Sequence, residues 1–245
     1  MRKGLTSQFW IALFVITFCS CNTYLWSQDW DQAWTQEQDP SPFAIGLHVG
    51  AGLPLGDLDL DNKFDGVPAT VKVQDFVVRD NLDVSLYMRY SFLDWLSVGF
   101  NLDYATSRLS QADIKVDTNG DIAVYRENLG RANILTGAVV VEVRVPQRLS
   151  WRNLSPYMFL GGGLNYHIWQ DPSNTTLETT VDPSFGMVVG GGLQFFVNAQ
   201  TILLLESSYH YDVANIEIAS AGKKRVSGDV DLSDVRIMVG IRFSL

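Results

Sequence analysis

Apolar and polar residues alternate along eight segments of this chain, and the last twelve residues show the pattern most clearly. On one side of this segment lie Val235, Ile237, Val239, Ile241, Phe243 and Leu245, and on the other Asp234, Arg236, Met238, Gly240, Arg242 and Ser244. Successive side chains of a β-strand point to opposite faces. The segment therefore predicts a strand with one apolar face and one polar face.

The same pattern predicts strands at 43–53, 81–92, 96–105, 131–145, 156–169, 185–197, 201–211 and 233–245. In this register, none of the apolar faces carries a charged residue. Charge facing lipid costs about 2–4 kcal/mol at mid-membrane for Arg or Lys, so the pattern favours strands that face lipid. The predicted fold is all-β: an eight-stranded antiparallel transmembrane up-and-down β-barrel with polar groups inside.

The connections between these strands alternate in length. Those at 93–95, 146–155 and 198–200 are short, and those at 54–80, 106–130, 170–184 and 212–232 are long. Bacterial outer-membrane barrels keep their short turns in the periplasm, so an even strand number predicts that both termini are periplasmic. Two sets of aromatic residues fall where interfacial girdles are expected: Phe92, Trp95 and Trp151 near the short turns, and Tyr104, Trp169, Tyr209 and Tyr211 near the long loops.

The N-terminus has the features of a secretory signal. Two basic residues precede an apolar run from Phe9 to Phe18, which is too short to span a bilayer. We expect a signal peptide over 1–27, a periplasmic leader over 28–41 and the barrel over 42–245. Two outcomes stay open: cleavage after Ser27, which removes both cysteines, and lipidation of Cys21.

The topology and the C-terminal residues resemble those of the small eight-stranded outer-membrane barrels, namely the OmpA membrane domain, OmpX and OmpW. These families carry a C-terminal assembly signal of the form Gly-x-x-Φ-x-Φ, which Gly240, Phe243 and Leu245 match, with Leu where Phe or Trp is usual. The resemblance implies recognition by the barrel-assembly machinery. It also implies either a surface-interaction role, as in OmpX-type barrels, or small-solute passage, as in OmpW-type barrels.

The polar faces define the candidate site, a polar network in the barrel lumen. Its residues are His48, Asp83, Arg89, Asp103, Glu142, Arg144, Glu206, His210, Asp234, Arg236 and Arg242. Five negative charges nearly balance four positive ones, which favours a plug of ion pairs over a lining of one sign. Many inward glycines allow either room for large side chains or a water-filled cavity, so a channel remains the alternative.

The sequence also contains residue types that occur in catalytic and metal-binding sites. His48, His167 and His210 all face inward but lie on strands that are not neighbours, so no metal site or cofactor is predicted. A lipid A-modifying enzyme is the third alternative, because Ser208, His210 and Glu206 are close in sequence, yet they face the lumen and no enzyme activity is predicted. The alternating carboxylates from Asp57 to Asp65 lack the late Glu of a calcium loop.

The formal net charge of −9 becomes −11 once Arg2 and Lys3 leave with the signal. An acidic chain without a basic stripe is a poor nucleic-acid binder. The predicted partners are therefore outer-membrane lipid, the assembly machinery, and a surface or host ligand at the long loops. Alternating residues in those loops predict that several strands extend beyond the membrane, where exposed strand edges can pair with a partner.

Overall fold

The computed structural model describes residues 41–55, 58–60, 63–64, 67–68, 70–118, 121–127, 130–146, 153–170, 177–198, 200–220 and 225–245. Side chains are described over fewer positions, because those at 56–81, 107–130, 147–152, 171–177, 199 and 220–226 are left out. The predicted signal peptide with Cys21 and Ser27, nearly all of the leader, and Trp151 lie outside these ranges. Within them, no helix is long and apolar enough to cross a membrane.

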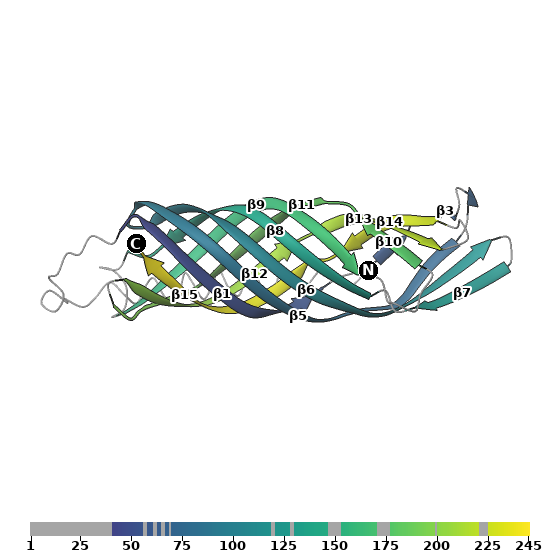
Figure 1. The fold of residues 1–245 in the computed structure, drawn as a ribbon, viewed down its shortest axis with the longest axis horizontal. Coiled ribbons are helices and arrows are strands. Elements are labelled where there is room, and N and C mark those ends of the chain that lie inside the picture. The colour runs from purple at the N-terminus through teal and green to yellow at the C-terminus, as the bar shows by residue number, and fades with distance from the viewer. Residues whose placement is uncertain are drawn as a thin grey trace, which may run out of the picture. The chain divides into compact units, whose positions relative to one another are not determined.

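Eight antiparallel strands close into a barrel. They are β1 (Phe43–Pro54), β5 (Thr70–Leu93), β6 (Leu96–Thr118), β8 (Gly130–Arg144), β9 (Leu154–Gln170), β11 (Ser184–Phe196), β12 (Thr201–Tyr211) and β15 (Asp234–Ser244). Each pairs with its neighbours in chain order, and β15 pairs with β1 to close the circle. The strands slant across the barrel (Figure 1). The predicted eight-stranded barrel is therefore confirmed.

The predicted alternation of faces is also confirmed. On β8, for example, Val139 and Val141 are exposed while Val140 and Glu142 are buried. The outward side chains form a belt of exposed apolar groups, including Leu164 at 68% and Val239 at 60% exposure. Trp169 is an exception to the predicted girdles. It is half-buried and lies two residues after the buried His167, on the same face of the strand.

Further strands extend the barrel at one end, which we call the sheet end. The remaining strands are β2 (Leu58–Leu60), β3 (Lys63–Phe64), β4 (Val67–Pro68), β7 (Asp121–Glu127), β10 (Leu177–Val181), β13 (Val213–Ser220) and β14 (Arg225–Asp231). A second sheet runs in the order β10-β13-β14-β2, and β7 pairs with β6 beyond the start of β8. β7, β13 and β14 lie at the opposite end from the C-terminus (Figure 1). The C-terminus marks the other end, which we call the turn end.

Among the fully described segments, three links join the two sheets: 182–183, 212 and 232–233. Across the link at 212 the pairing is continuous, because His210 pairs with Asp234 and Val213 pairs with Asp231. Across the link at 182–183 it shifts by one residue, as Val181 pairs with Ile216 but Met187 with Tyr211. Such a shift is a β-bulge, a place where proline is tolerated.

Polarity inverts at these links. In the barrel the charged groups lie on the buried side and the exposed side is apolar, whereas in the second sheet Ile216 and Val230 are fully buried, Asn215 and Asp229 are exposed and Glu217 is half-buried. A surface in water places its polar groups outside, and a surface in lipid does the reverse. The inversion therefore separates a lipid-facing barrel from a water-facing extension.

Candidate functional site: the polar interior of the barrel

Glu142 of β8 is the centre of a buried polar cluster near the turn end, which we call the inner cluster. Arg242 donates two hydrogen bonds to it, from Nη1 to Oε1 at 3.0 Å and from Nη2 to Oε2 at 2.8 Å. Arg89 Nε donates to Oε2 at 3.2 Å, and Gln194 Nε2 donates to Oε1 at 3.2 Å. Two-pronged Arg–carboxylate pairs are strong and directional. One carboxylate therefore cross-links β5, β8, β11 and β15 through the lumen.

Two tyrosines complete this level of the lumen. The Tyr87 ring centroid lies 5.1 Å from Arg89 Cζ and 5.2 Å from Arg242 Cζ, within the range of cation–π attraction. Tyr157 Oη donates to Glu206 Oε2 at 2.8 Å, and that oxygen lies 3.9 Å from His48 Nδ1. Charged and aromatic side chains thus occupy the lumen at this level.

Arg144 lies apart from this cluster, at the turn end. Its Nε donates to the backbone carbonyl of Asp94 at 2.8 Å and its Nη2 donates to Ser91 Oγ at 2.9 Å. Its side chain is only partly buried. Arg144 therefore ties β8 to the 93–95 turn.

A second cluster, the outer cluster, lies nearer the sheet end and has an excess of negative charge. Arg236 Nε donates to both carboxylate oxygens of Asp234, each at 3.0 Å, and lies 3.7 Å from Asp83 Oδ1. Neither carboxylate oxygen of Asp83 has a hydrogen-bond partner among the described residues, and nor does Asp103 Oδ2. Three carboxylates thus share one guanidinium. The outer cluster is therefore acidic, whereas Glu142 and Glu206 balance Arg89 and Arg242 at the level of the inner cluster.

A third group, the rim cluster, lies at the links between the two sheets. His167 Nε2 is 2.9 Å from Asp212 Oδ2, and Ser184 Oγ donates to Asp212 Oδ1. Nearby, Thr136 Oγ1 donates to Asn165 Oδ1 at 2.7 Å, and Asn165 Nδ2 donates to Ser184 Oγ at 3.3 Å. The rim cluster therefore connects β8, β9 and β11 to the residue that joins β12 to β13.

Asp212 lies outside the membrane-spanning strands, and its pKa is lowered. Burial alone would raise the pKa, but the hydrogen bond and positive charge of His167 and the hydrogen bonds of Ser184 and Asn165 favour the carboxylate. Asp212 is therefore ionised at neutral pH.

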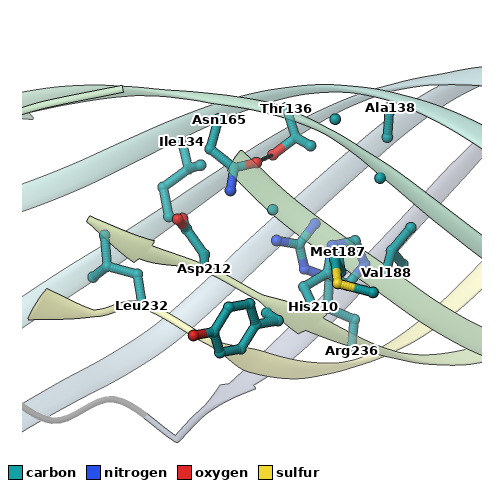
Figure 2. Close-up of a pocket in the computed structure, with 14 residues that line it drawn as sticks. Ile134, Thr136, Ala138, Asn165, Met187, Val188, His210, Asp212, Leu232 and Arg236 are labelled. Carbon is teal, nitrogen blue, oxygen red and sulfur yellow. Dashed lines mark hydrogen bonds between the residues drawn. The ribbon is translucent and has the colours of Figure 1, made fainter. Parts of the chain in front are cut away.

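A small cavity separates the rim cluster from the outer cluster. Figure 2 shows Asp212 and Leu232 on one side of it and His210 and Arg236 on the other. The backbone of Gly163 also lines it. The space accommodates about one water molecule.

The inward glycines make room for the large lumen side chains, as one of the sequence interpretations proposed. A Cβ on Gly190 would lie 2.6 Å from Phe159 Cζ, 2.7 Å from the Ser207 carbonyl oxygen and 2.8 Å from Ser208 Cβ. Cβ atoms do not approach other heavy atoms this closely. Close packing of this kind explains the glycines without an open channel.

Gly190→Ala is expected to lower the free energy of unfolding by about 1–3 kcal/mol, because overpacking forces neighbours to move. The measurement is the urea midpoint of the barrel in lipid vesicles. Gly137→Ala is the matched control, since its Cβ would lie 3.4 Å from Phe100 Cζ, an ordinary contact. Equal midpoints for the two variants would show that the lumen has spare volume.

The residues of the enzyme alternative are only partly brought together. Ser208 Oγ lies 3.2 Å from His210 Nε2, but the nearby acid Glu206 accepts a hydrogen bond from Tyr157. In the rim cluster Ser184 donates its hydrogen bond to the carboxylate of Asp212 and not to His167. Neither arrangement has the serine–base–acid order of a hydrolase.

In the part of the chain with described side chains, no three His, Cys, Asp or Glu residues are placed to hold a metal ion. The Asp57–Asp65 segment lies largely outside the described residues.

Sequence reasoning missed the role of Asp212 and Ser184. Both lie at strand ends, where alternation does not decide which way a side chain points. One signal for a polar site at this position was available in the sequence. Asp182 precedes the predicted strand at 185–197 and Asp212 follows the one at 201–211, and these two strands are neighbours in a barrel.

No protein-family model and no curated protein sequence matches this chain. Among solved structures, OprG from Pseudomonas aeruginosa is similar over 83% of this chain and 95% of its own, with 17% identity and a TM-score of 0.63. Neisserial surface protein A covers 84% of this chain and 98% of its own at 13% identity, with a TM-score of 0.48. The outer membrane protein AlkL covers 89% and 96% at 14% identity, with a TM-score of 0.46.

Similarity at this level of identity indicates a shared fold, and of these three structures only OprG superimposes closely enough to support that inference. The comparison agrees with the closed barrel described above. This chain has the fold of the small eight-stranded outer-membrane β-barrels.

Proposed function

We propose that this protein is a non-catalytic integral barrel of the bacterial outer membrane with a plugged lumen, whose role is surface interaction through its sheet end. The inner cluster carries the proposal. Glu142 holds two arginines across the lumen, and Tyr87 and Tyr157 occupy the remaining width. An eight-stranded barrel leaves room for little more than its own side chains. The function then lies outside the lumen.

The extension supplies the surface for such a role. β7 pairs with β6 and, among the described strands, with no other, so one row of its backbone groups is available. An exposed strand edge accepts an extended peptide by forming main-chain hydrogen bonds. The described charged side chains on the outer face of the second sheet include Glu178, Glu217 and Asp229, all acidic. The basic tip at 223–225 lies outside the residues with described side chains.

The orientation follows from the same proposal. The extension with its acidic, water-facing surface lies outside the cell, and the turn end, where β1 begins and β15 ends, lies in the periplasm. Gly240, Phe243 and Leu245 then belong to the strand that the barrel-assembly machinery recognises. In the barrel, Phe243 and Leu245 are exposed, whereas Gly240 packs against His48.

A small-solute channel is the second candidate function, and the cavity between the rim and outer clusters favours it. That cavity brings His210 and Arg236 within reach of a space at the sheet end. The inner cluster would have to rearrange for a solute to pass.

Single-channel recording of the folded protein in a planar bilayer tests the plug. We expect no discrete openings, because Glu142 is bonded to Arg242 and Arg89 across the lumen. A heat-modifiable gel shift of the same sample shows that the barrel is folded. Reproducible openings that change in Arg89→Ala or Glu142→Ala would establish a pore and overturn the proposal.

A further inference from the structure

We propose that the rim cluster is a latch that holds the second sheet against the barrel and keeps the cavity beneath it narrow, and that releasing Asp212 widens the cavity at the sheet end. The inference does not depend on the proposed surface role. It rests on the contacts of Asp212, on its place between the two sheets and on the cavity that it lines.

All four polar groups of Asp212 are engaged. Its carboxylate contacts His167 and Ser184 through different oxygens. Its backbone N–H donates to Ser233 Oγ at 3.1 Å, and its carbonyl accepts from the Leu232 N–H at 2.8 Å. Asp212 therefore joins β9, β11 and the link between β14 and β15 at one point.

His167 contributes to the latch with both ring nitrogens. Nε2 faces the Asp212 carboxylate, and Nδ1 lies 3.0 Å from the backbone carbonyl of Asp182. A carbonyl and a carboxylate are both acceptors, so the histidine satisfies them only when both nitrogens carry hydrogen. His167 thus joins the Asp212 carboxylate to a backbone carbonyl in the link at 182–183.

The latch coincides with the joint between the sheets. The links at 182–183, 212 and 232–233 interrupt the strands, and one of them carries a bulge. Local opening takes place where few ladder hydrogen bonds must break. At this joint, side-chain hydrogen bonds replace part of the ladder, so their loss is expected to free the second sheet.

The cavity lies directly behind the joint. Asp212 and Leu232 line its sheet-end side, and Ala138 and Arg236 line it deeper in the barrel (Figure 2). Displacing Asp212 and Leu232 would remove that side of the lining. The polar groups that face Asp212 are His167 and Asn165 from β9, Ser184 from β11 and Ser233, with His210 and Arg236 across the cavity.

Cysteine labelling tests the latch, because Cys19 and Cys21 are the only cysteines of the chain. With both replaced by serine, Ala138→Cys places a thiol in the cavity, and its reaction with a sulfonated maleimide is followed in lipid vesicles. We expect slow labelling, and at least tenfold faster labelling when Asp212→Asn is added. Asp182→Asn is the matched control, since that exposed residue contacts His167 through its backbone carbonyl.

A second thiol distinguishes opening of the cavity from general unfolding. Ala105→Cys lies in the interior on β6 but does not line the cavity, so its labelling is expected to stay slow in every background. Unchanged labelling of Ala138→Cys in a folded Asp212→Asn barrel would overturn the proposal. If Asp212→Asn does not fold, Ser184→Ala replaces it, because this variant removes one contact of the Asp212 carboxylate. Labelling of Ala138→Cys and Ala105→Cys is then compared in the Ser184→Ala background, and unchanged labelling of Ala138→Cys would overturn the proposal.

Labelling at low pH provides an independent test of the latch. The folded pKa of Asp212 lies below its ordinary 3.8, so its contribution to the latch is complete above 3.8 and is lost as the pH falls through the folded value. Dipyridyl disulfide, which reacts with thiols in acid, should label Ala138→Cys faster below about pH 4 than Ala105→Cys. Asp212→Asn should abolish this acceleration. An equal acceleration in the presence of Asp212→Asn would exclude Asp212 as the titrating group.

Discussion

Replacing Glu142 with alanine is expected to cost about 3–5 kcal/mol of unfolding free energy, the largest loss for any single lumen residue. The variant removes the only carboxylate that Arg242 contacts among the described side chains, together with the ion-pair partner of Arg89. The buried guanidiniums of Arg242 and Arg89 then lose the carboxylate that they contact directly, and leaving a buried charge without a bonded partner costs more than the lost hydrogen bonds.

The measurement is urea unfolding of the barrel in lipid vesicles, followed by tryptophan fluorescence. Glu178→Ala makes the same chemical change at an exposed position and is expected to alter stability by no more than about 0.5 kcal/mol. Adding Arg242→Met to Glu142→Ala should restore part of the loss, because one of the two unpaired charges is removed. If Glu142→Ala is no worse than Glu178→Ala, water or ions must neutralise the arginines, and the lumen is not a dry plug.

The second large effect is expected on the outside of the barrel. Val139→Arg should destabilise the protein by about 2–4 kcal/mol, because it places a charge in the middle of the lipid-facing belt. Val139 is 58% exposed and lies halfway between Leu135, which pairs with Tyr104, and Val143, which pairs with Leu96. In water, such an exposed position would accept arginine at little cost.

An outward-facing position near the end of a strand, away from the middle of the membrane, provides the control for this prediction. Leu53 is 63% exposed but lies near the sheet end of β1, so Leu53→Arg should cost about 0–1 kcal/mol. Unfolding of both variants is measured in vesicles of one lipid composition. A cost that does not differ between the two positions would show that the apolar belt does not face a bilayer core.

The sequence was sufficient for the eight barrel strands and for the direction of most of their side chains, with Trp169 as an exception. Both follow from a period of two residues, which is a local property. For this reason Arg89, Glu142 and Arg242 could all be placed inside the barrel before any pairing was known. Gly190 and Phe159 could likewise be placed on one side, with steric room as one explanation.

Which residues meet in the lumen could not be predicted. Glu142 and Arg242 are 100 residues apart, and their contact depends on the stagger of eight strands around a closed circle. The separation of Arg236 with its three carboxylates from Arg89 and Arg242 depends on the same stagger. The contact of Asp212 with His167 lies beside the bulge at the 182–183 link, and alternation alone does not reveal that bulge.

The change of solvent at the links has a consequence for how the length of this chain can vary. From β12 into β13, even-numbered residues stay on the buried side while that side changes from polar to apolar. An insertion of one residue between Tyr211 and Val213 would turn Ile216 and Ile218 outward into water. An insertion of two residues would keep them buried. Related chains that fold in the same way should therefore differ here by even numbers of residues, unless a second bulge on the same strand restores the original facing.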